Sequence, residues 1–549
     1  MPDLLTLPEE LLCKISGFVH PQTVIEWACT CKVLSRCSLQ ALKTHKQRRS
    51  ELRVVHDRNP ITVPSLLRDS LSEPEILWYV RSLDIWDLRE NFEEWMSPDF
   101  VEENPHVELD DWNAKESLTW PGEYHDPSHL DTTFYTDEEL ERYRTMLSKM
   151  LHLREPLVDK WMERLRSGSD EPQKVLLMAM SPRLSQATFV NEDDSWQAGE
   201  KSHPFRLLAS SLRALAPLPC PEWPCFQNLK IVFVGQYTTL RHSFDAYHPH
   251  SRVIAPLFLL PAIEELHLNL LLGEENDAES DLENDEEDGK DSVPYVWEWE
   301  IGRSSCQKLA FDCCELATET IASFIGATHS LRSLNGVISD DEIISALLEH
   351  SKHSLETVNF DQQNLLPTPD AVPQQSLQTF QKLASIALST TQLVDISTYK
   401  PSQIEYTVDH GIDMEKSAFG TTDWVDLLTF LPPTLQTLKI YQKRTRLFGH
   451  EIESLMDHLV ALVKAKRSPS NGAFGALTEI CLANLLVKSA NPRRVYEPNG
   501  LDPWLGALKR VCEEAEVKIH TKARTTWIEG SSGDSYPCSS CRLDEMGQS

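Results

Sequence analysis

Side chains that bind metals in proteins gather at two places in the chain. The first cluster lies within nine residues and comprises His242, Asp245, His248 and His250. Zinc requires a fixed tetrahedral set of ligands. Here Tyr247 and Pro249 stand among the histidines, which favours a surface loop over a metal site.

The second cluster is the Cys-x-x-Cys pair Cys538 and Cys541. One such pair supplies two ligands, and Cys512 and His520 are the available candidates for the other two. The Gly- and Ser-rich stretch 530–535 before the pair favours a flexible tail. The sequence therefore predicts no metal and no cofactor.

No motif of nucleotide or hydrolytic chemistry accompanies these clusters. The 20 glycines are dispersed and never form a Gly-x-x-x-x-Gly-Lys phosphate loop. The zinc-protease motif His-Glu-x-x-His and the nucleophile motif Gly-x-Ser-x-Gly are absent as well. We therefore expect that no residue of this chain is catalytic and that the protein is not an enzyme.

A repeat indicates the architecture that positions the functional surfaces. His-Ser-Leu occurs at residues 329–331 and again at 353–355, an offset of 24 residues that is typical of leucine-rich repeats. Between the copies, Ser339 and Glu342 stand in capping-box positions. The helical run that follows contains Ile343, Ile344, Leu347 and Leu348. The predicted unit is a strand, a loop, a helix and the next strand, as in a solenoid.

The strand pattern apolar-x-x-apolar-x-apolar recurs along the chain. The ten segments begin at Val80, Leu184, Leu229, Ile263, Cys306, Leu331, Leu355, Leu383, Leu435 and Leu477. Because 41% of the residues are hydrophobic, the pattern also arises by chance, and turn pairs such as Pro182-Arg183 before it support the assignment. The segment at Leu331 departs from the pattern at Gly336. The predicted fold class is α/β, an irregular leucine-rich-repeat-like solenoid of strand–helix units.

The first 45 residues predict three short helices. Thr6 and Glu9 stand in capping-box positions with Pro8 in the first turn, and His20-Pro21 ends the first helix. Its apolar face comprises Leu7, Leu11, Leu12, Ile15 and Phe18. The second helix contains Val24, Ile25 and Trp27, and the third contains Cys31, Leu34, Leu39 and Leu42. Such a small unit buries little surface and is often completed by a partner or a neighbouring segment.

This order of apolar and turn residues resembles the F-box, a three-helix module that docks proteins onto ubiquitin ligases. The resemblance implies that the helices bind the Skp-type adaptor of a Skp–cullin–F-box ligase. The implied adaptor contacts are Leu7, Pro8, Leu11, Leu12, Ile15 and Val24. With its irregular repeats, the whole chain resembles fungal F-box proteins with degenerate leucine-rich repeats. The residues alone leave open a plain helical cap on the domain behind them.

The net charge of −32 is unevenly spread. Residues 90–131 hold 13 acidic groups against one lysine, and residues 274–291 hold 11 against one lysine. Residues 1–50 instead carry a balance of +3. So acidic a chain is expected to bind no nucleic acid. The acidic insertion at 273–292 is predicted to be disordered. The acidic segment 90–131 is instead predicted to be ordered and to pack the rings of Trp95, Trp112 and Trp120 onto its domain.

Targeting signals and cysteine usage limit the cellular compartments in which the protein is expected. No opening stretch resembles a signal peptide, and charged residues interrupt the most apolar region, 253–272, so no membrane span is expected. The 13 scattered cysteines are predicted to be reduced thiols. These features predict a protein of the cytoplasm, the nucleus or both.

The predicted organisation has four parts. They are an F-box at 1–50, a connector at 51–170 with the first strand, the acidic Trp-containing segment and helices, the solenoid at 171–525, and a flexible tail at 526–549. Within the connector, Thr136 and Glu139 cap a helix that runs to about His152. Pro156 precedes a second helix that ends at Leu165.

The expected function is substrate recognition for ubiquitin ligation. The F-box would hold the adaptor of the cullin ligase, and the solenoid would capture an unknown protein target. The outward residues of the concave strand face are the predicted target contacts, namely Arg332, Ser333, Glu356, Thr357, Gln436 and Thr437. The alternative is a non-catalytic repeat scaffold whose F-box-like helices bind another partner.

Overall fold

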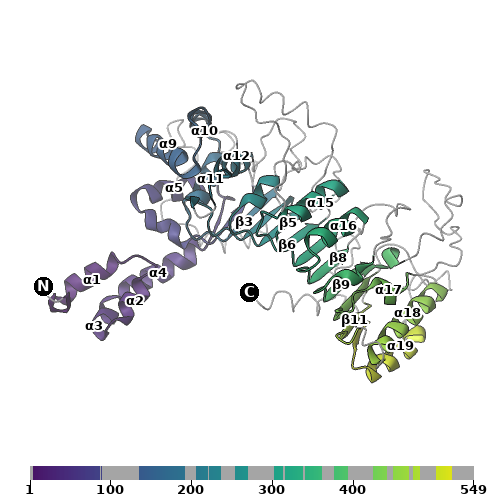
Figure 1. The fold of residues 1–549 in the computed structure, drawn as a ribbon. Coiled ribbons are helices and arrows are strands. Elements are labelled where there is room, and N and C mark those ends of the chain that lie inside the picture. Colours follow the sequence, from purple (N-terminus) through teal and green to yellow (C-terminus); the bar gives the residue numbers. More distant parts are fainter. Residues whose placement is uncertain are drawn as a thin grey trace, which may run out of the picture. The chain divides into compact units, whose positions relative to one another are not determined.

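The structure is a computed structural model (Figure 1). It describes residues 4–86, 88–89, 135–191, 206–219, 222–236, 254–269, 302–312, 314, 316–337, 341–360, 376–393, 425–441, 449–468, 474–482 and 502–521. The chain divides into two compact units, Met1–Leu272 and Gly273–Ser549, each taken by itself below. The division falls at the start of the predicted acidic insertion, 273–292, which lies outside the described residues, as do the tail 526–549 and the three tryptophans of the acidic segment.

The first unit opens with short helices. They are η1 (Leu4–Thr6), α1 (Glu9–Gly17), α2 (Val24–Cys29), α3 (Lys32–Cys37) and α4 (Leu39–Leu52). We call residues 4–52 the N-terminal helical module. Its small core contains Leu12, Leu34 and Cys37, against which Leu7, Trp27, Cys31 and Val33 pack. Buried serines add hydrogen bonds, because Trp27 Nε1 donates to Ser16 Oγ at 2.9 Å and Ser38 Oγ donates to the Leu34 carbonyl at 2.7 Å.

Five parallel strands form the sheet of the first unit. They are β1 (Val54–His56), β2 (Ser82–Ile85), β3 (Gln186–Asn191), β4 (Ile231–Gln236) and β5 (Glu265–Asn269). Each strand pairs in parallel with the next one in chain order. Val55, Leu83, Ala187, Val232 and Leu266 stand in register across all five strands, and all are buried.

Helices connect these strands. They are α5 (Thr62–Ser72), η2 (Pro74–Tyr79), α9 (Asp137–Leu151), α10 (Glu155–Ser167), α11 (Glu171–Met180), α12 (Arg206–Leu215) and η6 (Ala255–Leu259). The predicted capping box of α9 is confirmed: Thr136 Oγ1 accepts from the Glu139 amide, and the Glu139 carboxylate accepts from the Thr136 amide. The second predicted helix is confirmed as α10, with Pro156 in its first turn. Helix α11 is the innermost, with every residue from Glu171 to Ala179 buried.

The second unit repeats the same alternation. Its strands are β6 (Lys308–Asp312), β7 (Ser333–Val337), β8 (Thr357–Phe360), β9 (Ser385–Ser389), β10 (Thr437–Tyr441), β11 (Glu479–Cys481) and β12 (Lys518–His520). Its helices are α15 (Thr318–Ala327), α16 (Asp341–His350), η8 (Leu377–Thr379), η9 (Thr390–Leu393), α17 (Leu427–Phe430), α18 (Gly449–Arg467) and α19 (Asp502–Glu514). All the pairings are parallel and follow chain order. The α-helices lie along one side of the strands (Figure 1).

The predicted class, α/β with alternating strands and helices, is confirmed. Each of the ten predicted strand segments overlaps one of the strands β2 to β11, and the apolar pattern positions are buried. The exception is Gly336, whose φ of +78° and β-bulge explain the departure from the pattern. A Cβ at that position would lie 1.5 Å from the Phe311 carbonyl oxygen, so only glycine fits there.

Two local predictions for the N-terminal helical module are wrong. Helix α1 begins after Pro8, which is its N-cap, and no side chain caps it. Instead of closing a capping box with Thr6, Glu9 forms an ion pair with Arg36 of α3 at 2.6 Å. The predicted third helix is two helices, because Ser38 separates α3 from α4. The module therefore has four α-helices where the sequence predicted three.

Candidate functional site

Large apolar side chains are exposed mainly on the N-terminal helical module. Among the described residues, five of the seven exposed large hydrophobic side chains belong to it, namely Leu4, Leu11, Phe18, Ile25 and Leu39. Phe18 is 86% exposed, and Ile25 and Leu39 are each 64% exposed. The other two, Val54 and Phe233, are 49% and 38% exposed. We call the five residues of the module the exposed apolar set.

The brevity of the helices explains this exposure. A helix of six to nine residues presents one narrow stripe to the small core, so apolar residues off that stripe face solvent. In α1, Leu12 is completely buried whereas its neighbour Leu11 is 45% exposed. In α2, Val24 is buried whereas Ile25 is exposed. Several exposed large apolar side chains on one small module are a feature of protein–protein interfaces.

The six residues implied as adaptor contacts divide into three groups. Pro8 and Leu11 are exposed, and Leu7 and Ile15 are half-buried. Leu12 and Val24 lie inside the module, with 0% and 2% exposure. These two side chains hold the helices together and reach no surface, so any contact with a partner passes through the other four. The prediction did not include Ile25 and Leu39. For Ile25 the reason is that adjacent apolar residues in a short helix, here Val24 and Ile25, do not reveal which one faces inward.

Contacts at α4 join the module to the rest of the first unit. Arg48 forms a two-pronged ion pair with Glu73, and His45 hydrogen bonds with Tyr79 of η2. Burial and the Arg48 cation lower the pKa of His45 below its ordinary value. The ring of His20 also meets the ring of Trp78 edge-on, with 4.8 Å between their centroids.

The six predicted target contacts come together on the strand face of the second unit. Their backbones stand in register: the Glu356 amide donates to the Arg332 carbonyl, and the Gln436 amide donates to the Ala384 carbonyl of the intervening segment. Thr357 Oγ1 donates to Ser333 Oγ at 2.8 Å. Thr437 stands beside Ser385 of β9, which in turn stands beside Thr357.

This arrangement creates a row of small polar side chains across four adjacent strands. The row is Ser333, Thr357, Ser385 and Thr437. All four are half-buried, and they alternate with the buried leucines and isoleucines of the pattern. The pattern located the six predicted residues but missed Ser385, whose place in the row depends on strand pairing.

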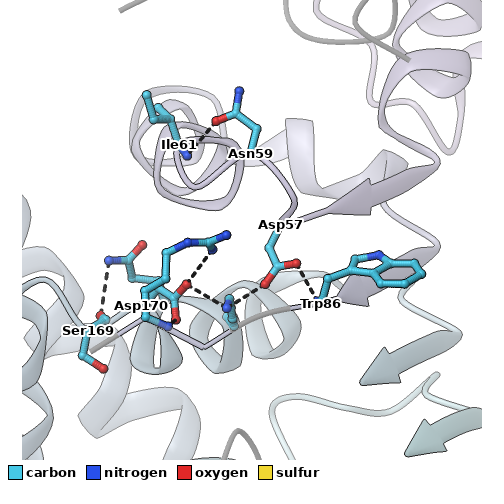
Figure 2. A network of polar contacts seen from close by, with 9 residues as sticks. Asp57, Asn59, Ile61, Trp86, Ser169 and Asp170 are labelled. Atoms are coloured by element: carbon cyan, nitrogen blue, oxygen red, sulfur yellow. Dashed lines mark hydrogen bonds and ion pairs between the residues drawn. The ribbon is translucent and has the colours of Figure 1, made fainter. Parts of the chain in front are cut away.

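A buried cluster of charges lies beside α11 in the first unit (Figure 2). Lys174 Nζ is 2.7 Å from Asp57 Oδ2 and 2.7 Å from Asp170 Oδ2. Arg89 Nη1 lies 3.1 Å from the same oxygen of Asp170. All four side chains are 2% exposed, and their two positive and two negative charges balance. We call them the buried charge cluster.

The cluster connects three segments that are distant in the sequence. Asp57 directly follows β1 and also accepts a hydrogen bond from the Trp86 amide at 2.7 Å. Asp170 precedes α11 and accepts from the Arg89 amide at 3.0 Å. Burial alone would lower the pKa of Lys174, but the carboxylates of Asp170 and Asp57 raise it above its ordinary value. A nucleophilic lysine needs a lowered pKa, whereas this ammonium lies 2.7 Å from both carboxylates and joins their segments through ion pairs.

The candidate metal ligands predicted from sequence are not brought together among the described residues. The cluster from His242 to His250 and the pair Cys538 and Cys541 lie outside the described residues. Cys512 is buried in α19, and His520 pairs with Glu479 at 3.2 Å. No group of three or more metal-binding side chains occurs in the described part of the chain. The same residues contain no helix both long and apolar enough to cross a membrane.

We compared the chain with models of known protein families and with curated proteins, and neither comparison found a match.

Proposed function

We propose that this protein is the substrate-recognition subunit of a Skp–cullin–F-box ubiquitin ligase. In this proposal the N-terminal helical module is an F-box that docks the Skp-type adaptor. The strands and helices that follow are degenerate leucine-rich repeats that hold a protein target. The ligase brings the target close to a charged ubiquitin-conjugating enzyme, and proximity raises the effective concentration of the acceptor. No residue of this chain is then required to be catalytic.

The observation that carries the proposal is the concentration of exposed apolar side chains on one small module. Burying a large apolar side chain is favourable by about 1.5–3 kcal/mol. The five side chains of the exposed apolar set therefore leave a large stabilisation unused in the isolated chain. A helical cap that merely completed its own domain would instead turn these residues toward that domain. A partner that covers them accounts for their position.

The repeat assignment is supported by the regular burial of the strand pattern. In a leucine-rich repeat each strand places its apolar residues inward and leaves the alternate positions on an accessible face. The parallel register and the buried pattern residues of β2 to β11 agree with this. The irregular spacing, 24 residues in one unit and 52 in another, is the feature that makes the repeats degenerate.

The proposed target surface is the strand face of the second unit. Its row of hydroxyl side chains, with Arg332 and Glu356 beside it, offers hydrogen-bond donors and acceptors and little apolar area. Such a face suits a polar, extended segment of a target protein. A cytoplasmic or nuclear location follows from the ligase assignment.

The direct test is co-purification with a Skp-type adaptor and a cullin. The wild type is expected to retain both, and the triple variant L11D/F18D/I25D is expected to lose both, because each aspartate is exposed in the free protein and buried in the complex. The double variant L7D/P8A tests the half-buried Leu7 and the exposed Pro8 before α1. Val54→Asp is the matched control, because Val54 is also exposed but lies outside the module. Retained binding in the triple variant would refute the assignment.

The same experiment separates the scaffold alternative. A scaffold whose helices bind another partner would lose that partner in the triple variant but would never co-purify with a cullin. Deleting residues 1–45 and identifying the proteins that accumulate then tests target capture. If the protein is a substrate receptor, its target is expected to accumulate, because the truncated receptor can no longer bring that target to the ligase.

A further inference from the structure

Four arginines gather where the N-terminal helical module meets the sheet of the first unit. Arg49 and Arg53 stand four residues apart at the end of α4, and therefore share one face. Arg81 directly precedes β2, and Arg183 lies in the turn before β3. We call these residues the arginine cluster. They come from three segments separated by 28 and 102 residues in the sequence.

Backbone hydrogen bonds fix two of the four next to each other. The amides of Arg81 and Ser82 both donate to the Arg53 carbonyl at 3.0 Å. The amides of Ser185 and Gln186 in turn donate to the Arg81 carbonyl at 2.9 and 3.1 Å. Arg53 and Arg81 therefore occupy equivalent positions on neighbouring strands, and Arg183 is two residues before the next equivalent position.

Trp78 orients two of the guanidinium groups. Arg81 Nη1 donates to the Trp78 carbonyl at 2.8 Å, and the guanidinium carbon of Arg183 lies 4.8 Å from the centre of the Trp78 ring. Stacking on an aromatic ring leaves the edge of a guanidinium free to donate hydrogen bonds. Arg49, Arg53 and Arg183 are exposed, and Arg81 is half-buried.

These arginines lack the carboxylate partners that nine other described arginines have. In the described residues, none of the four forms an ion pair. By contrast, the described arginines that do pair with carboxylates are Arg36, Arg48, Arg68, Arg89, Arg142, Arg144, Arg164, Arg332 and Arg467. What sets them apart, in a chain with a net charge of −32, is that four unpaired cations lie close enough to act on one another.

The positive charges of the four arginines repel one another, and no counter-charge among the described residues balances them. Burial, followed by the charges of Arg183, Arg49 and Arg53, lowers the pKa of Arg81 to about 10. The charged groups that act on this side chain are all cations, so nothing in the described residues offsets their repulsion. An anion bound between the guanidiniums would do so.

We propose that the arginine cluster binds a phosphate group carrying two negative charges. Guanidinium forks match the oxygens of phosphate in paired hydrogen bonds, and arginines from separate segments surround such a group from several sides. The cluster occupies a compact area at the starts of β2 and β3, which fits one phosphate and not an extended polyanion. The acidity of the rest of the chain disfavours RNA or DNA, whose charge continues beyond the site.

The phosphate is either free or carried by a phosphorylated serine of a protein. Isothermal titration calorimetry at low salt with inorganic phosphate, and with a phosphoserine peptide beside its unphosphorylated form, distinguishes the two sources. The wild type is expected to bind at least one phosphate ligand saturably and to ignore the unphosphorylated peptide. A single-stranded RNA oligonucleotide is the third ligand, and it is expected to bind more weakly than the best phosphate ligand.

The test variant is R49S/R53S/R183S, which removes the three exposed guanidiniums and spares the backbone contacts of Arg81. Each lost charge-assisted contact is expected to weaken binding roughly tenfold. Arg166→Ser on α10 is the matched control, because Arg166 is exposed and has no ion pair among the described residues, and it is expected to bind as the wild type does. Circular dichroism verifies that the variants are folded.

Three results would overturn the proposal. They are no saturable binding of either phosphate ligand by the wild type, equal binding by the folded triple variant, and RNA binding that inorganic phosphate does not displace. The test is independent of the ligase assignment, since none of the substituted residues belongs to the exposed apolar set.

Discussion

Helix α11 and the N-terminal helical module place their side chains in opposite ways. The surroundings of α11 take four charged groups out of water, with Lys174 held between two carboxylates. The module leaves five large apolar side chains in water. A buried, charge-balanced cluster is complete within the chain, because every charge has its counter-charge. The exposed apolar set, by contrast, is not covered by any of the described residues. The first arrangement therefore stabilises the fold, and the second is the surface on which we propose that a partner docks.

Removing Lys174 tests the first half of this comparison and should have the largest effect. Lys174→Met keeps the length of the side chain but leaves the Asp57 and Asp170 carboxylates buried with Arg89 as their remaining cation. Breaking such a cluster is expected to lower the free energy of unfolding by about 3–5 kcal/mol. Urea unfolding followed by tryptophan fluorescence measures this loss. The exposed Lys149→Met on α9 is the control, and an equal midpoint for the two variants would contradict the structural role.

Removing Leu12 tests whether the module has a core of its own. Leu12→Ala empties a completely buried site and is expected to cost about 2–4 kcal/mol. Faster amide hydrogen exchange in α1, α2 and α3 reports this loss. The neighbouring Leu11→Ala, at an exposed site, should change exchange little. If both variants behave alike, the module does not distinguish an inner from an outer face.

The strand-forming residues show how far local sequence determines this fold. Ten strands were predictable because three apolar residues at fixed spacing identify a strand with one buried face. Strand β1 escaped the pattern because Asp57 occupies the position that Ile85 takes in β2; the register pairs Val55 with Leu83. A carboxylate is acceptable there only because Lys174 lies opposite it, and no local pattern reveals that pairing. Strand β12 escaped because its flanking positions are the polar Glu516 and Thr521.

The candidate surfaces were predictable to different degrees. The apolar residues of the module were visible in the sequence, but the division between buried Leu12 and exposed Leu11 required the packed helices. The arginine cluster was invisible, because its members come from three distant segments that only strand pairing brings together. Periodicity therefore identifies elements, whereas sites that span several elements depend on topology.

Glycine substitutions compare packing tightness in the two regions. Gly336 has a positive φ, and an added Cβ would meet the Phe311 carbonyl, so Gly336→Ala is expected to cost about 2–3 kcal/mol. Gly17 ends α1 with open space around it, so Gly17→Ala should cause no loss of stability. Thermal unfolding of the two variants measures the difference. Equal losses would show that the module is as tightly packed as the strand region.

Replacing Phe18 should have the smallest effect on stability and the clearest effect on association. Phe18 is 86% exposed, so Phe18→Ser is expected to change the free energy of unfolding by less than about 0.5 kcal/mol. The same change removes the most exposed apolar side chain of the module, so the adaptor binding that we propose should weaken. Sedimentation velocity with and without the adaptor measures this loss of binding. If Phe18→Ser destabilises the module as much as Leu12→Ala, then Phe18 packs within the fold. The most exposed apolar residue of the module would then belong to its core, which contradicts the contrast between the buried charge cluster and the exposed apolar set.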